Sequence, residues 1–331
     1  MKRGVLASLT AGFAASVLAS LSPAHGAQTV DYPSRAVRIV VPFPPGGALD
    51  IIARHTATRF TELLGQNFFI ENRAGASGSM GVEAVARAVP DGYTLLAGNV
   101  GTNPINEVLF ADSQPTRPSR DLVAITKLVE IPHILAVTPS LPARTVAEFI
   151  ALARSNPRKF NYGSVGAGSY PQLDALRLEK AAGIRMTHVP YKGAAPIIQG
   201  LVTGEIHISF VNLASTVNLV KAGKLRAIAA FSSTRLKELP ENATIAEQGF
   251  AGIGTNAWQG LFAPAATPKP IVDKLFKTAV AALSPPDVKD KLARQMMDVT
   301  LSKSPQEFAE FVRAEVQKWA EVIRENNVRI E

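Results

Sequence analysis

The sequence of 331 residues contains no cysteine. This absence excludes disulfides, thiol nucleophiles and thiolate metal ligands, so stability must come from the packed core alone. Familiar motifs of catalysis and cofactor binding are missing too: there is no G-x-S-x-G nucleophile elbow, no H-E-x-x-H zinc motif and no phosphate-binding GK[ST]. These absences predict a protein that is not an enzyme and that carries no cofactor and no metal.

The spacing of the histidines and acidic residues likewise predicts neither a metal site nor acid–base catalysis. Beyond the N-terminal segment the histidines are His55, His133, His188 and His207, and none has the close spacing of a metal site. Three of them lie in strand patterns, where a structural role is the ordinary one. Acidic residues fall mostly in first turns of helices or on polar faces, so no carboxylate pair stands out for acid–base chemistry.

The basic residues form no nucleic-acid site. The formal net charge is +8, from 35 Lys and Arg against 27 Asp and Glu, and it becomes +6 when Lys2 and Arg3 are removed and 33 remain. The densest basic groups, at 154–159 and 221–226, contain no interleaved exposed aromatic residues of the kind that grip single strands. We therefore expect no nucleic-acid partner.

The first residues predict export. Lys2 and Arg3 are followed by an uncharged run, Gly4–Leu21, and then by small residues at 22–27. This order is typical of a cleavable signal peptide, here residues 1–26, with cleavage after Ala24 or Ala27 as alternatives. A retained membrane anchor is the other interpretation, but the run is diluted by Ser, Thr, Gly and Ala. We expect a soluble, monomeric protein in the periplasm.

From residue 35 onward, short β-branched runs alternate with turn-rich loops and helical runs. A first series of strand patterns covers 35–41, 67–71 and 93–97, and a second covers 133–138, 160–163, 186–189, 206–210 and 225–231. Such βαβ alternation predicts an α/β fold of two lobes, each a mostly parallel sheet flanked by helices. A first crossing near 125–131 and a strand-like return at 254–263 predict lobe 1 as 27–127 plus 256–331, and lobe 2 as 128–255.

Helix starts carry recognisable signals. Thr145, Thr244 and Ser304 are each followed three residues later by Glu, which matches the capping box. Thr267 before Pro268 predicts a cap with proline at the first helical position. The last helix has an apolar stripe that includes Trp319, which we expect in the core.

Loops rich in Gly, Ser and Asn follow many of the strand patterns. In open α/β sheets, ligands bind beyond the carboxyl ends of the strands, and helix N-termini there bind anions through backbone amides. Several such loops facing one cleft would hold a carboxylate, although each could also be an ordinary βα turn.

For Asp50 we favour a capping role with Arg54 as ion-pair partner over ligand contact, and Lys192 could simply be solvated. The glycine-rich 75–81 segment is a weak cofactor motif that could line the cleft.

Six segments in order resemble one known family. They are YPSRAVRIVVPFPPGGALDIIAR (32–54), ENRAGASGSMG (71–81), PDGYTLL (90–96), HVPYKGAAP (188–196), AGKLRAIA (222–229) and WQGLFAPAATP (258–268). They resemble the Bug-type extracytoplasmic solute receptors, the substrate-binding proteins of tripartite tricarboxylate transporters. The resemblance implies a two-lobed Venus-flytrap (periplasmic-binding-protein) fold with two interdomain crossings, a small organic carboxylate as ligand and membrane transporter subunits as partners. A receptor that signals to a membrane sensor is an alternative, and an exported enzyme on the same scaffold is a third.

The loops and the resemblance together define the expected ligand site. Its residues are Phe43, Pro45, Gly46, Gly47, Ala48, Asp50, Gly78, Asn99, Gly101, Ser164, Gly166, Gly168, Ser169, Gln172, Tyr191, Lys192, Gly193, Val211 and Asn212. Two of them depart from the family pattern: Gln172 stands where a histidine is common, and Val211 where many members have aspartate. We therefore expect a dicarboxylate or aromatic carboxylate instead of an α-amino acid.

Overall fold

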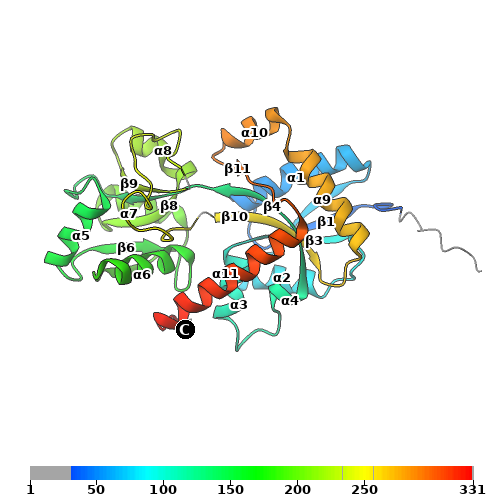
Figure 1. Ribbon diagram of the computed structural model, residues 1–331, viewed down its shortest axis with the longest axis horizontal. Coiled ribbons are helices and arrows are strands. Elements are labelled where there is room, and N and C mark those ends of the chain that lie inside the picture. Colours follow the sequence, from blue (N-terminus) through cyan, green and yellow to red (C-terminus); the bar gives the residue numbers. More distant parts are fainter. Residues whose placement is uncertain (1–30, 233, 256, 330–331) are drawn as a thin grey trace, which may run out of the picture. The chain divides into compact units, whose positions relative to one another are not determined.

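Two β-sheets organise the part of the chain that the computed structural model describes, residues 31–232, 234–255 and 257–329. The first sheet has the strand order β11-β4-β10-β3-β1-β2 and the second β7-β6-β8-β5-β9. Most of these strands are labelled in Figure 1. The first sheet contains β1 (Val37–Val41), β2 (Phe68–Asn72), β3 (Thr94–Asn99), β4 (Leu122–Ile131), β10 (Ala257–Pro264) and β11 (Asp298–Val299). The second contains β5 (His133–Val137), β6 (Asn161–Ser164), β7 (Thr187–Pro190), β8 (Ile208–Asn212) and β9 (Arg226–Phe231).

Helices cover both faces of each sheet. Helices α1 (Ala48–Leu64) and α9 (Lys269–Leu283) share one apolar cluster of the first sheet, and α2 (Ser79–Ala86) and α11 (Pro305–Glu325) share the other. In the second sheet, α5 (Val146–Ser155) and α6 (Tyr170–Ala182) pack on one face, with α7 (Ala194–Thr203) and α8 (Leu213–Lys221) on the other. Strand residues alternate between the clusters, as the two-residue period of a strand requires. The shorter elements are η1 (Ala76–Gly78), η2 (Gly101–Ile105), α3 (Asn106–Leu109), α4 (Pro118–Asp121) and α10 (Pro286–Ala293).

The strand directions place several loops at one edge of each sheet. Strands β1, β2 and β3 are parallel, and so are β6, β7 and β8, while β10 and β5 run antiparallel to their neighbours. The sheets are therefore mixed in pairing, although most of their strands share one direction. Because carboxyl ends of parallel strands meet at one edge, the loops after β1, β2 and β3 are neighbours, as are those after β6 and β7.

The chain passes from the first sheet to the second close to the crossing that the sequence indicates at 125–131. Strand β4 continues to Ile131 in the first sheet, and His133 already pairs in the second. The expected division after residue 127 is four residues before this passage, and the lobe boundaries stay a prediction. The sequence indicates 125–131 only as a crossing, whereas β4 is a ten-residue strand with many buried residues. Such strands lack a clean polar face, which hides them from an alternation pattern.

The helix signals have mixed outcomes. Thr145 and Ser304 accept hydrogen bonds from the backbone amides of Glu148 and Glu307, as predicted for α5 and α11. The Thr244 box also forms, but it closes a turn, and no helix begins there. The prediction for Thr267 was wrong: Pro268 is the N-cap of α9, and the Thr267 hydroxyl has no hydrogen-bond partner.

The stripe of the last helix is confirmed, since Trp319 is fully buried in the cluster that joins α11 to the first sheet. The predicted signal peptide, residues 1–26, lies outside the described residues. Within the described ranges, no helix is both long and apolar enough to cross a membrane.

Candidate functional site

The loop after β1 is held in shape by the side chain of Asp50. Its carboxylate accepts hydrogen bonds from the Gly46 amide (2.9 Å), from two Arg54 nitrogens (2.9 and 3.0 Å) and from Asn72 Nδ2 (2.9 Å). The carboxyl is nearly inaccessible. Burial alone would raise its pKa, but the hydrogen bonds from Arg54, Gly46 and Asn72 outweigh it and lower the pKa. The expected ion pair with Arg54 is confirmed, but Asp50 does not cap α1: it binds the Gly46 amide in the preceding loop, and the N-cap is Gly47.

The same loop presents the beginning of helix α1. Gly47 is the N-cap and has no side chain to accept a hydrogen bond from the first helical amides. Those amides have no intrahelical acceptors, and the helix dipole adds partial positive charge there. Pro45, Gly46 and Gly47 are exposed, and Phe43 and Ala48 are half-buried. An anion could therefore approach these amides from solvent.

The loop after β2 forms a left-handed turn. The φ angles of Gly75, Ala76, Ser77 and Gly78 are 137°, 46°, 54° and 92°, so four successive residues have positive φ. Left-handed backbone costs about 1–2 kcal/mol per non-glycine residue, and such strain concentrates at functional sites.

Gly78 brings three loops of the first sheet together. A Cβ at Gly78 would lie 2.6 Å from Thr102 Cγ2 and 3.4 Å from Pro42 Cβ, so only glycine fits this approach. Thr102 belongs to the loop after β3, and its amide and that of Gly101 donate to Asn99 Oδ1, both at 2.9 Å. Asn99 and Gly101, expected at the ligand, are thus half-buried and shape this loop.

In the second sheet, the loop after β6 is closed by its own polar groups. The buried Ser164 hydroxyl donates to Gly166 O (3.0 Å) and accepts from the Gly166 amide (3.1 Å). The Ser169 hydroxyl donates to the same carbonyl at 2.7 Å. Ser169 is also the N-cap of α6, but its side chain accepts nothing from the helix. The first amides of α6 therefore resemble those of α1 in lacking a side-chain acceptor.

Gln172 and His188 extend this network. Gln172 Oε1 accepts from the Gly168 amide at 2.6 Å, and Gln172 Nε2 lies 3.4 Å from His188 Nδ1. His188 Nε2 lies 2.7 Å from Ser164 Oγ. No sequence motif marks this serine–histidine pair, because its members are 24 residues apart. Since the Ser164 proton is donated to a carbonyl, the imidazole donates from Nε2 and accepts at Nδ1. Burial lowers the pKa of His188, in agreement with a neutral ring. The pair orders the loop, and Ser164 is fully buried.

The remaining expected residues differ in accessibility. Tyr191 is bound to the loop after β6 through its amide, which donates to Ser164 O at 2.9 Å. Lys192 is exposed, and Gly193 is the uncapped N-cap of α7. Val211 is buried in an apolar cluster of the second sheet. Asn212 caps α8 by accepting from the Ala214 amide at 2.7 Å. Val211 and Asn212 thus have structural contacts that the sequence did not predict.

Helix α3 connects the loops of the two sheets. Asn106 Nδ2 donates to Ser77 O at 2.9 Å, which ties α3 to the left-handed turn. Three residues later, Leu109 lies against Gly168, where an added Cβ would be 2.3 Å from Leu109 Cδ1. Neither Asn106 nor Leu109 is among the residues expected from the sequence. The only sequence signal is that Asn106 follows the polar loop after β3, while nothing local marks Leu109.

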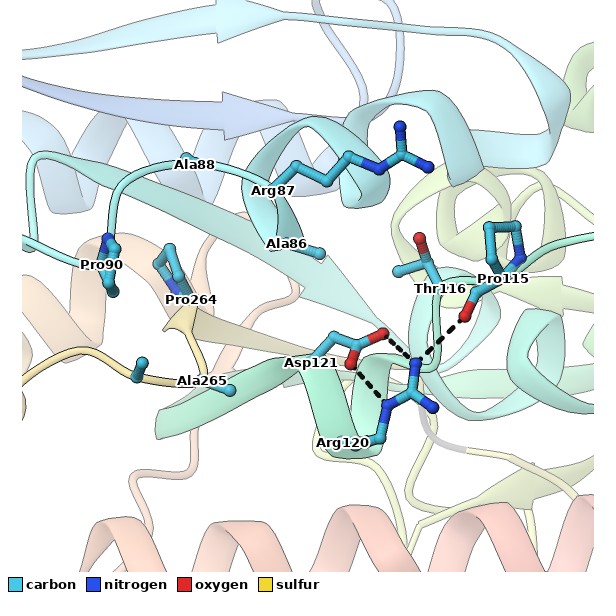
Figure 2. A pocket seen from close by; sticks show the side chains of 11 residues that line it. Ala86, Arg87, Ala88, Pro90, Pro115, Thr116, Arg120, Asp121, Pro264 and Ala265 are labelled. Atoms are coloured by element: carbon cyan, nitrogen blue, oxygen red, sulfur yellow. Dashed lines mark hydrogen bonds and ion pairs between the residues drawn. The ribbon is translucent and has the colours of Figure 1, made fainter.

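A separate pocket of about 480 Å³ opens at another edge of the first sheet (Figure 2). Its lining includes Pro90, which precedes β3, and Ala265, which follows β10, so it lies away from the carboxyl ends of β1–β3. Figure 2 shows that Arg120 is engaged by Asp121 (2.6 Å) and Pro115 O (3.1 Å). None of the expected site residues lines it. The described residues also contain no group of histidines and carboxylates able to hold a metal ion.

Residues 52–328 match the tripartite tricarboxylate transporter family receptor. The chain belongs to this family. Among relatives of this receptor, BugT from Bordetella pertussis (strain Tohama I) is 30% identical and covers 97% of this chain and 95% of its own. The sequence-based resemblance to Bug-type receptors is thereby confirmed.

Solved structures confirm the two-sheet α/β fold of this receptor. A protein from R. palustris solved with adipate is 35% identical, with a TM-score of 0.79 over 90% of this chain and 99% of that one. MatC from Rhodopseudomonas palustris, solved with bound malate, is 33% identical, with a TM-score of 0.75 over 88% of this chain and 100% of that one.

Proposed function

We propose that this receptor acts in the periplasm as a monomer and binds a small organic carboxylate between the loops of its two sheets. It then delivers the acid to a membrane transporter of the tripartite tricarboxylate type. The role is binding without catalysis. The expected site residues, including the exposed Pro45, Gly46, Gly47 and Lys192, are part of this proposal.

One observation carries the proposal. The loops after β1 and β6 open α1 and α6 with N-caps, Gly47 and Ser169, whose side chains accept nothing from the helix. Side-chain caps are present on α5, α8 and α11, whereas α9 and α10 lack them as α1 and α6 do. What distinguishes α1 and α6 is that their first amides follow the carboxyl ends of the parallel strands β1 and β6, where ligands bind in open α/β sheets. Amides left without a side-chain acceptor are ready donors to a carboxylate, directly or through water.

The two family members solved with ligands support the ligand class. One contains adipate and the other malate, and both molecules are dicarboxylates. The loops of this chain suit the same chemistry, because their donors are backbone amides and their one acidic residue, Asp50, is already engaged. The uncharged run after Lys2 and Arg3 supports export.

The decisive experiment removes one amide from α1. Proline is tolerated at the first position of a helix, and Gly47 already has the extended conformation that a residue before proline prefers. Ala48→Pro should therefore fold normally while deleting one donor. We expect its affinity for the tightest acid in a calorimetric panel of mono-, di-, tri- and aromatic carboxylates to fall at least tenfold.

The control is Lys269→Pro, which deletes the first amide of α9, a helix outside the proposed site. It should leave affinity unchanged. For the original chain, an acid present at a hundredfold excess over its Kd should add about 2.7 kcal/mol to the free energy of unfolding. A panel in which no carboxylate binds, or an Ala48→Pro protein that binds like the original, would refute the proposal.

A further inference from the structure

Few large apolar side chains are exposed in the described residues. They are Leu63, Phe69, Met80, Val89 and Val165. Single exposed apolar residues are ordinary on soluble proteins and need no explanation by themselves. Two of these belong to the proposed carboxylate site: Val165 lies in the loop after β6, and Met80 lies in the first turn of α2, directly after the loop that follows β2.

Met80 belongs to the first-sheet part of that site. It is the second residue of α2, directly after the left-handed turn at 75–78, and its side chain is 49% exposed. Its sulfur covers the turn, since a Cβ at Gly75 would lie 2.3 Å from Met80 Sδ. Through Gly78, this turn also lies close to Pro42 and Thr102. Met80 therefore lies two residues beyond Gly78, the point at which the loops after β1, β2 and β3 meet.

Val165 belongs to the second-sheet part. It directly follows Ser164, the last residue of β6, and its side chain is 45% exposed. Its loop reaches α3 through Gly168, which lies against Leu109. One turn earlier on α3, Asn106 holds the left-handed turn next to Met80. A single helical turn thus links the loop of Val165 to the loop of Met80.

These loops also lack a free carboxylate that could pair with a ligand ammonium. Asp50 is the only acidic residue in segments 42–50, 73–81, 99–106, 164–172, 190–194 and 211–215. Its oxygens already accept from Arg54, Asn72 and the Gly46 amide. A ligand ammonium brought into this site would lose its hydration without gaining a carboxylate partner, which is unfavourable.

We propose that Met80 and Val165 contact the hydrocarbon body of the bound acid, so that the receptor selects carboxylates with aliphatic or aromatic bodies over equally long acids that carry a hydroxyl or an ammonium group. This inference rests on the proposed function. Methionine suits the role because its flexible, polarisable side chain adapts to bodies of different shape.

Two matched series of acids test the selection by calorimetry on the purified chain. The first compares adipate, 2-hydroxyadipate and 2-aminoadipate, and the second compares phenylacetate, mandelate and phenylglycine. In the series that binds, the unsubstituted acid should bind at least tenfold tighter than its hydroxyl or amino analogue. Equal or tighter binding of the substituted acids would overturn the inference while leaving carboxylate binding, and so the proposed function, intact.

Two variants test whether Met80 and Val165 cause the preference for the unsubstituted acid. Val165→Thr keeps the shape of the side chain but adds a hydroxyl, and Met80→Gln keeps its length. Each should reduce the preference for the unsubstituted acid at least threefold. Val89→Thr is the matched control, because Val89 is 70% exposed and lies outside these loops. The same preference in the Val165→Thr and Val89→Thr proteins would overturn the role of Val165. If no acid of either series or of the wider panel binds, the proposed function fails and this inference fails with it.

Discussion

His133 in β5 and Tyr170 at the start of α6 are joined by a 2.6 Å hydrogen bond between imidazole Nε2 and the phenol. His133 Nδ1 lies 2.9 Å from Ile131 O, so Nδ1 carries the proton and Nε2 accepts from Tyr170. The bond therefore joins the passage between the two sheets to the helix that begins at the proposed anion loop. Burial lowers the pKa of His133 to about 4, which keeps the ring neutral.

Asp174 is a second buried titratable group, and it lies on α6, the helix that begins with Tyr170. Asp174 is 1% exposed; it accepts from Thr255 Oγ1 at 3.2 Å and lies 3.5 Å from Arg177. Burial raises its pKa to about 6, against the opposing effect of Arg177 and Lys318. His133 and Asp174 thus respond to acid in opposite senses.

The first prediction concerns stability between pH 7 and pH 4. The pKa of His133 is lower in the folded chain than its ordinary value of 6.5, so the folded state is favoured above pH 6.5 by keeping this ring neutral. As the pH falls from 6.5 toward 4, the free energy of unfolding should decrease by about 3 kcal/mol. The pKa of Asp174 is raised, so its charge destabilises the fold above pH 6, and acid relieves this cost by a similar amount. We expect Asp174→Asn to lose stability more steeply than the original chain between pH 6 and pH 4, and His133→Asn to lose it less steeply.

Urea denaturation at several pH values measures both slopes. The two variants act as controls for each other, because a general loss of packing would lower stability by a constant amount at every pH. Parallel stability–pH curves for all three proteins would show that neither group titrates as its burial requires.

The second prediction concerns the contact between Gly168 and Leu109. Gly168 has a φ of +74°, and an added Cβ would meet Leu109 Cδ1 at 2.3 Å. Gly168→Ala should therefore lose about 1–2 kcal/mol from its backbone conformation and more from the clash. Gly183→Ala is the control, because Gly183 has a φ of +63° but open space around its Cβ position. It should show the conformational cost alone.

A double-mutant cycle with Leu109→Ala isolates the contact. Truncating Leu109 removes the atom that would clash, so the two changes together should cost less than their sum by about 1 kcal/mol. Strict additivity would mean that the loop after β6 does not rest on α3 in solution. The arrangement that links the loops of the two sheets would then need another basis.

The sequence could predict the fold where its pattern is local. Strands such as Val37–Val41 stand out because β-branched residues are bounded by turn residues, and the proposed loops follow because carboxyl ends of parallel strands share an edge. Strand β4 was missed, since residues buried on both faces give no alternation. Thr244 has a complete capping box without a helix, which shows that the box can also close a turn.

Side-chain roles at the site were harder to predict because they depend on partners distant in sequence. The ion pair of Asp50 with Arg54 followed from their spacing on α1, but the hydrogen bond to Asp50 from Asn72 comes from strand β2, which is distant in sequence. The burial of Val211 depends on the helices that cover β8. The contact of Leu109 with Gly168 has no local signature, since it forms only when elements of the two sheets come together.

The last prediction concerns the charge of the loop after β6. Gln172 accepts from the Gly168 amide and faces His188 Nδ1, whose ring is neutral because burial lowers its pKa. Gln172→Glu can still accept from Gly168, but it adds a negative charge beside the proposed carboxylate and raises the pKa of His188. We expect carboxylate affinity to fall at least tenfold at pH 8 and to recover partly at pH 5.5, where a protonated His188 offsets the new charge. Calorimetry at both pH values measures the carboxylate affinity, and an NMR titration measures the pKa of His188.

Gln199→Glu is the control: it makes the same charge change at an exposed position on α7 and should alter affinity little at either pH. Equal losses in the two variants would mean that only net charge, and not the contact with Gly168 and His188, controls binding.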